Sequence, residues 1–154
     1  MDKIKQESVL FFQKLFDVDC TQPIGDSLDF IPRIVTEEDN ANLVTAPTME
    51  EVKKAVFSLS SDSAVGVDGF NRVFYKTYWH ILADYLFKAV EDFFFGGSLT
   101  KAITRTLLCL IPKVKYPATF MDFRPISLCT FASKVFSKIL ANRMGELLPK
   151  IISH

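Results

Sequence analysis

The sequence predicts an α+β fold that is predominantly helical. Three segments, at residues 48–59, 79–93 and 132–148, repeat apolar side chains at the 3.6-residue period of an amphipathic helix. A separate apolar run from Leu107 to Ile111 is short and continuous, which is typical of a strand. With 154 residues, 49% of them apolar and fifteen of them Phe, the chain has enough material for one core.

The first expected element is a helix over residues 3–16, with Val9, Phe12 and Phe16 on one face. Residues 17–47 are acidic and show little periodicity, so they are predicted to form a long connection. The chain-breaking residues of this connection are Pro23, Gly25, Pro32 and Pro47.

Thr48 then begins a helix with a predicted capping box, in which Thr48 is the N-cap and Glu51 lies three residues later. The expected buried stripe consists of Val52, Ala55, Val56 and Leu59. The next segment, Ser63 to Phe70, has two glycines that flank Asp68, but it lacks the spacing of phosphate-binding glycine loops. It is predicted to be a turn in which Asp68 bonds nearby backbone amides.

Two further helices complete the helical set. The helix over residues 79–93 is expected to end at Gly96-Gly97, and Pro149 is expected to stop the last helix. The apolar positions of the first are Trp79, Leu82, Leu86, Ala89, Val90 and Phe93. Those of the last are Ala132, Val135, Phe136, Ile139, Leu140, Met144, Leu147 and Leu148, with Lys134 and Lys138 on the opposite face.

The candidate functional residues are cations that follow the predicted strand. The strand ends at Lys113 and Lys115, and the loop after it presents Arg124 directly before Pro125, which favours an extended backbone at Arg124. Fixed cations that bracket one loop suit phosphate oxygens, so Lys113 and Arg124 are predicted to bind phosphates. The alternative is structural: Lys113 is a solvated strand end, and Arg124 pairs with Asp122.

The net charge of zero conceals an uneven distribution. Residues 1–100 carry nine Lys and Arg against 16 Asp and Glu, whereas residues 101–154 carry nine against two. A basic final third that contains the candidate cations favours a nucleic-acid or nucleotide surface. The alternative is that the acidic and basic parts attract each other in the folded chain.

Other classes of protein find little support in the sequence. No apolar run approaches the ~18 residues of a membrane span, and the first residues lack the apolar stretch of a secretory signal. An intracellular protein is therefore expected, in the nucleus or the cytoplasm, not secreted and not in a membrane. The cysteines Cys20, Cys109 and Cys129 have no zinc-ligand spacing with His80 or His154. They are predicted to be reduced thiols, with Cys109 buried.

Four pieces of sequence, in order, resemble the reverse transcriptase of LINE-type (non-LTR) retrotransposons, the plant-type elements especially. T-M-E-E-V-K-K-A-V-F-S-L looks like the helix that opens the polymerase domain, and D-S-A-V-G-V-D-G-F is similar to the family's D-x-A-P-G-P-D-G-F loop. L-I-P-K with D-F-R-P-I-S-L resembles the fingers block, and K-V-F-S-K-I-L-A-N-R-M resembles the helix after it. Val65 and Val67 replace the family's usual prolines, so the loop is expected to be less rigid.

The resemblance, over about Ala46 to Ser153, implies the fingers and the start of the palm of a right-hand polymerase. Residues 1–46 would be an N-terminal helix and acidic connector, and 47–154 the N-terminal part of the reverse transcriptase domain. The family copies RNA into DNA with Mg²⁺ and deoxynucleoside triphosphates. Lys113 and Arg124 would hold phosphates of the nucleotide or template. The implied partners are the RNA template, the DNA primer, the dNTP, and palm and thumb segments beyond these residues.

No catalytic residue and no metal site are expected in this fragment, and no cofactor, although Mg²⁺ is implied for the full-length enzyme. The sequence contains no Y-x-D-D, and F-M-D at 120–122 matches the F-x-D of polymerases only superficially, because it directly precedes R-P-I-S-L. The fragment is therefore expected to be inactive alone. Two alternatives remain open: a small non-enzymatic protein that binds nucleic acid or a partner with this fold, and a translated relic without a selected role.

Overall fold

The computed structural model describes residues 2–17 and 34–152, and its contacts divide the chain into two units. One unit contains residues 2–17 and 110–126, and the other contains 34–109 and 127–152. The elements are α1 (Asp2–Phe16), α2 (Glu37–Val44), α3 (Met49–Ser58), α4 (Arg72–Thr77), α5 (Trp79–Phe94), α6 (Lys101–Thr104), β1 (Thr106–Pro112), the 3-10 helix η2 (Phe120–Asp122), β2 (Phe123–Cys129) and α7 (Phe131–Ile151). Helices predominate over one two-stranded sheet, which confirms the predicted α+β class. No helix in the described ranges is long and apolar enough to cross a membrane.

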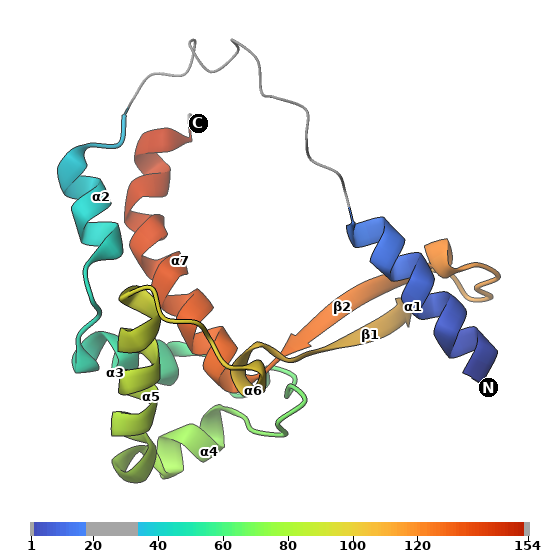
Figure 1. The fold of residues 1–154 in the computed structure, drawn as a ribbon, viewed down its shortest axis with the longest axis horizontal. Coiled ribbons are helices and arrows are strands. Elements are labelled where there is room, and N and C mark those ends of the chain that lie inside the picture. The colour runs from blue at the N-terminus through green and yellow to red at the C-terminus, as the bar shows by residue number, and fades with distance from the viewer. Residues whose placement is uncertain (1, 18–33, 153–154) are drawn as a thin grey trace. The chain divides into compact units, whose positions relative to one another are not determined.

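The core of the larger unit forms where α3, α5 and α7 meet (Figure 1). Its buried side chains belong to the three apolar stripes expected from the sequence, with Phe131 added at the start of α7. They are Val52, Ala55, Val56, Leu86, Val90, Phe131, Val135, Phe136 and Ile139. Burying each large aliphatic or aromatic side chain contributes about 1.5–3 kcal/mol. These three helices therefore hold the larger unit together.

Helix α7 differs from its prediction in two ways. Leu140, Met144 and Leu148 were expected in the buried stripe, but all three are exposed. Pro149 does not stop the helix: it lies inside α7, which continues to Ile151. The apolar pattern of α7 is thus wider than the surface that this unit covers.

The end of α5 confirms the predicted glycine stop. Gly96 has a φ of +85°, which is in the left-handed region where glycine is favoured. Its amide donates to the carbonyl of Phe93 (3.0 Å), and the amide of Gly97 donates to that of Asp92 (2.8 Å). These two bonds form a Schellman motif, which satisfies carbonyls that the helix end leaves open.

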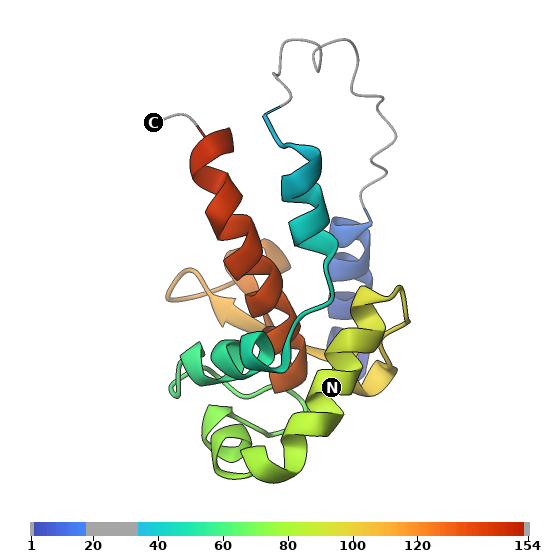
Figure 2. The ribbon, with the colours of Figure 1, turned by 90° about the vertical axis from the view of Figure 1, so that its left-hand side faces the viewer.

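Helix α2 lies inside the segment predicted to be a connection, so that prediction is wrong for residues 37–44. The amide of Asp39 donates to Oγ1 of Thr36 (3.1 Å), and the amide of Thr36 donates to Oδ2 of Asp39 (3.0 Å). This reciprocal pair is a capping box, for which the letters T-E-E-D are the sequence signal. Helix α2 lies alongside α7 in both views (Figures 1 and 2). Residues 18–33 of the predicted connection are outside the described residues.

The loop from Ser63 to Phe70 is a turn, but Asp68 acts over a long range. Oδ2 of Asp68 accepts from the amide of Phe131 (3.2 Å), in the first turn of α7, so the prediction of local bonds was wrong. Gly69 takes a φ of +72° and donates to the carbonyl of Gly66 (3.1 Å). A Cβ at Gly66 would overlap the carbonyl of Cys129. The loop therefore needs its glycines for shape and for close approach.

Strands β1 and β2 form an antiparallel hairpin, drawn as two opposed arrows in Figure 1. The amide of Lys113 donates to the carbonyl of Asp122 (2.7 Å) at the turn end, and Thr106 contacts Cys129 at the other end. Residues 113 and 122 thus oppose each other, as do 111 and 124. The predicted strand is confirmed, but Cys109 within it is exposed, not buried.

Helix α1 packs through its phenylalanines. Phe12 is buried, and its ring contacts those of Phe11 and Phe120, with centroids 5.1 and 6.4 Å away. Val9 and Phe16, which were predicted on the same helical face as Phe12, are both exposed. The side of α1 that packs against the turn of the hairpin therefore includes Phe11 as well as Phe12.

Candidate nucleic-acid interface

The hairpin register brings the two predicted cations to one face. Lys113 directly follows β1 and opposes Asp122, whereas Arg124 is the second residue of β2 and opposes Ile111. Arg124 was expected in the loop after the predicted strand, but it lies in strand β2. Side chains two residues apart on a strand point the same way. Lys113 and Arg124 are thus diagonal neighbours, and residues in this relation lie about 7–8 Å apart.

The turn between the strands is folded by Asp122. Its Oδ2 accepts from the amides of Ala118 (2.9 Å) and Thr119 (2.8 Å) and from the hydroxyl of Thr119 (3.1 Å). These bonds, led by the Thr119 amide, lower the pKa of Asp122 from its ordinary value. Nζ of Lys113 donates to the carbonyl of Met121 (2.9 Å), so Lys113 also supports the turn. The F-M-D segment is consequently a structural element of the hairpin.

Arg124 is exposed and is free of Asp122. The ion pairs found in the described ranges are Arg143–Glu51 and Lys150–Asp39, so the expected alternative for Arg124, a pair with Asp122, is wrong. An exposed guanidinium keeps its forked donors for a ligand. Lys113 uses one of its three ammonium donors within the turn. The hairpin can therefore offer two cations to one anionic group.

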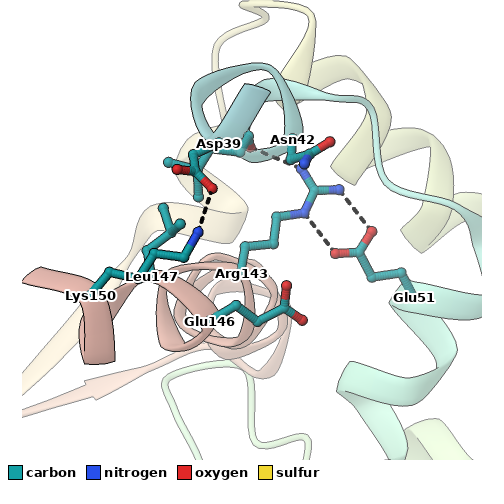
Figure 3. Close-up of a pocket in the computed structure, with 8 residues that line it drawn as sticks. Asp39, Asn42, Glu51, Arg143, Glu146, Leu147 and Lys150 are labelled. Carbon is teal, nitrogen blue, oxygen red and sulfur yellow. Dashed lines mark hydrogen bonds and ion pairs between the residues drawn. The ribbon is translucent and has the colours of Figure 1, made fainter. Parts of the chain in front are cut away.

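Arg143 is a second basic centre, which the sequence did not single out (Figure 3). Its Nε and Nη2 donate to the two carboxylate oxygens of Glu51, at 2.7 and 2.8 Å. Its Nη1 donates to the carbonyls of Leu43 (2.9 Å) and Thr45 (2.5 Å), and its guanidinium lies 4.8 Å from the ring centroid of Phe94. The sequence does carry a signal for this role, because Arg143 lies on the same side of the last helix as the apolar residues Ile139 and Leu147.

A cavity of about 320 Å³ lies beside this arginine (Figure 3). Lys150 donates to Asp39 at 3.0 Å across its rim. The Thr36 amide, then Lys150 and the Thr36 hydroxyl, lower the pKa of Asp39 to about 2. The cavity is lined by Asp39, Asn42, Leu43, Glu51, Arg143, Glu146, Leu147 and Lys150. Most charged side chains of this cavity form ion pairs with one another, Arg143 with Glu51 and Lys150 with Asp39. Their role is therefore to hold α2 against α3 and α7.

The remaining cation of α7 with a defined role is Lys134. It was expected on the face of the helix opposite the apolar stripe, and its Nζ donates to Oγ of Ser63 (2.9 Å) and to the carbonyl of Ala64. Together with Arg143 and Lys150, it shows that the basic final third partly serves to hold segments from the acidic part. The alternative reading of the charge distribution therefore applies to these three residues, while Arg124 stays available.

The described residues contain no group of three or more His, Cys, Asp or Glu side chains that could hold a metal ion. The acidic residue of the hairpin turn, Asp122, is engaged, because its carboxylate accepts from backbone amides that fold the turn. The exposed cations of the hairpin are therefore suited to binding an anion.

Comparison with curated proteins finds a distant relative of the chain. No family model matches the chain. A search of curated proteins finds the Transposon TX1 uncharacterized 149 kDa protein of Xenopus laevis, 26% identical over 153 residues. The match covers 98% of this chain and 12% of that protein, so the chain spans a small part of its relative's length. The chain is thus distantly similar to a transposon protein along nearly its whole length.

Proposed function

We propose that this chain is the fingers portion, with the start of the palm, of a reverse transcriptase from a LINE-type (non-LTR) retrotransposon. In this proposal, residues 1–46 are its connector. The sequence pieces that resemble that family occupy α3, the Ser63–Phe70 loop, the β1–β2 hairpin and α7, in the family's order. The distant similarity to a transposon protein supports a retrotransposon origin. The activity and partners of the whole enzyme belong to the proposal.

The biochemical role that we assign to the hairpin is contact with phosphates of a nucleotide or template strand. The observation that carries it is the placement of Arg124 and Lys113 on one face, with Arg124 exposed and outside the ion pairs of the described chain. A guanidinium can engage two phosphate oxygens at once, whereas an ammonium acts as a point charge. Arg124 is therefore the principal ligand and Lys113 the secondary one.

Mg²⁺, which the family resemblance implies, does not fit the described residues. No cluster of three or more potential ligands is found among them, and Asp122 is occupied by Ala118 and Thr119. No metal-dependent step is assigned to this chain. Its proposed contribution is to bind and orient phosphates, which favours transfer only when a catalytic centre is supplied by other residues.

Further protein is the second proposed partner, in the form of palm and thumb segments. Leu140, Met144 and Leu148 share one side of α7 and are exposed at 38%, 51% and 40%. Apolar side chains at this spacing are typical of a helix that packs against another element.

The rival function is a self-sufficient protein that binds nucleic acid or a partner. The buried core of α3, α5 and α7 favours it, because those helices already form a closed cluster.

The location of the interface can be tested by photocrosslinking. Single-stranded RNA that carries 5-iodouridine is irradiated with the 154-residue chain, and the linked peptides are identified by mass spectrometry. We expect the crosslinks to concentrate in residues 110–126. Crosslinks that spread equally to exposed aromatic side chains outside the hairpin, such as Tyr85 of α5, would contradict an interface on the hairpin. A protein that binds RNA tightly without further domains would favour the rival function.

A further inference from the structure

Within the part of the chain that the structure describes, strand β1 has an edge that pairs with no other strand. The described sheet has only the strands β1 and β2, so β1 hydrogen-bonds on one side. The bond from Lys113 to Asp122 fixes the alternation: residues 107, 109 and 111 turn their backbone groups toward β2. Thr106, Leu108 and Leu110 then point their amides and carbonyls away from it. Such a row of groups is a template for another strand.

The side chains of β1 do not protect this edge, in contrast to those of β2. The sequence of β1, T-L-L-C-L-I-P, contains no charge, and most of its residues are exposed. Strand β2 contains Arg124 and Pro125, which are the residue types that discourage pairing at a sheet edge. A strand that joins this sheet is therefore expected at β1.

We propose that the partner strand is β1 of a second copy of this chain, paired antiparallel about a two-fold axis at Cys109. This register overlaps the seven residues of both strands completely. The amides of Leu108 and Leu110 meet the carbonyls of Leu110 and Leu108 of the second copy, and the amide of Thr106 meets the carbonyl of Pro112. Pro112, which has no amide proton, falls at the end of the strand. The product is a four-stranded sheet.

The same register matches side chains. Leu107 and Ile111, each 50% exposed, oppose each other across the axis, so both lose apolar surface to water. Cys109 opposes its own copy in a pair without hydrogen bonds, where Cα atoms are about 4.5 Å apart. This separation lies in the range that a disulfide spans. Since Cys109 is exposed and free, it reports on the register.

The first test uses the full chain with Cys20→Ser and Cys129→Ser, which leaves Cys109 as its sole thiol. Diamide takes up the two electrons and two protons released as two thiols become one disulfide. We expect rapid formation of a covalent dimer, and sedimentation equilibrium of the reduced protein should show a dimer of the same mass. A reduced protein that stays monomeric at its highest soluble concentration would overturn the proposal.

Variants separate this interface from other surfaces. Leu110→Pro removes an outward amide without touching the bonds to β2, and should weaken the dimer about ten-fold or more, whereas Leu110→Val should not. Cys109→Lys places like charges opposite each other and should weaken it about five-fold. Tyr85→Lys, on the exposed side of α5, is its charge-matched control. Circular dichroism verifies that each variant folds. A dimer that resists Leu110→Pro but is lost on Met144→Gln would place the interface on α7 and refute the proposal.

Discussion

Glu51 and Arg143, 92 positions apart, form a bidentate ion pair, with Nε–Oε1 at 2.7 Å and Nη2–Oε2 at 2.8 Å. Glu51 sits at the position expected to close a capping box with Thr48. Its amide does donate to Oγ1 of Thr48 (3.2 Å), but its carboxylate turns to Arg143. Because Arg143 also binds the carbonyls of Leu43 and Thr45, one side chain connects α2, α3 and α7.

Loss of this connection should destabilise the larger unit. Arg143→Ala leaves the Glu51 carboxylate and two carbonyls without their partner, and the side chains of the pair are only 13% and 28% exposed. We expect the free energy of unfolding to fall by about 2 kcal/mol in urea titrations. Arg143→Lys should recover little, since an ammonium cannot make the forked contact. Lys54→Ala, at an exposed position of α3, is the control. An Arg143→Lys variant as stable as the wild type would contradict the role of the forked contact.

Two glycine substitutions should act in opposite directions. Gly66→Ala should lower the free energy of unfolding by about 1–3 kcal/mol, because the added Cβ overlaps the backbone of Cys129. Gly145→Ala, inside α7 and with open space around it, should raise that free energy by about 0.5–1 kcal/mol. Paired thermal and urea unfolding of the two variants measures both effects. Equal changes in the same direction would show that the loop does not approach β2 as described.

Stability should depend on pH through Asp39. Its pKa falls from 3.8 to about 2 in the fold, so the folded state favours the carboxylate. A lowered pKa contributes stability that is complete above the unfolded value and is lost as pH falls through the folded value. Unfolding followed by circular dichroism should therefore show this contribution disappearing between about pH 4 and pH 2. Asp39→Asn should flatten that part of the curve, whereas Asp84→Asn, on the exposed side of α5, should leave its shape unchanged.

The sequence was sufficient for elements whose signal is local. The stripes of α3 and α5, the N-cap Thr48 and the Gly96-Gly97 stop are recorded in residues close together in the chain, and each was confirmed. Helix α2 was missed, although T-E-E-D carries a capping signal, because its eight residues contain few apolar positions. The exposed side of α7 could not be predicted, because periodicity shows which residues are apolar but not what covers them.

The candidate site was only partly readable for the same reason. Lys113 and Arg124 stand out through their local context, but their common face depends on strand pairing, which no window of sequence contains. Arg143 and Asp68 act across 92 and 63 positions, so neither role has a local signature. Asp68 was assigned a local role because a flanking glycine pair usually marks a self-contained turn. Long-range polar contacts are thus the part that required the structure.

The chain alone should not polymerise DNA. Its sequence contains no Y-x-D-D, and the described residues form no carboxylate cluster for metal ions. Purified residues 1–154 should extend no primer on an RNA template with Mg²⁺ or Mn²⁺, next to an active reverse transcriptase as a positive control. Template-dependent extension above the background of a no-protein reaction would refute this expectation.

Fluorescence anisotropy of labelled single-stranded RNA, over a range of salt concentrations, tests whether Arg124 and Lys113 form a phosphate-binding face. Each phosphate contact contributes about −0.7 to the slope of log affinity against log salt. Arg124→Ala should lose the most affinity and flatten the slope by about that amount. Lys113→Ala should have a smaller effect, because its ammonium also serves Met121. Lys53→Ala on α3 and Arg105→Ala, an exposed arginine of the same basic segment, should change neither quantity. If either control weakens binding as much as Arg124→Ala, the attraction is diffuse and the hairpin is not the site.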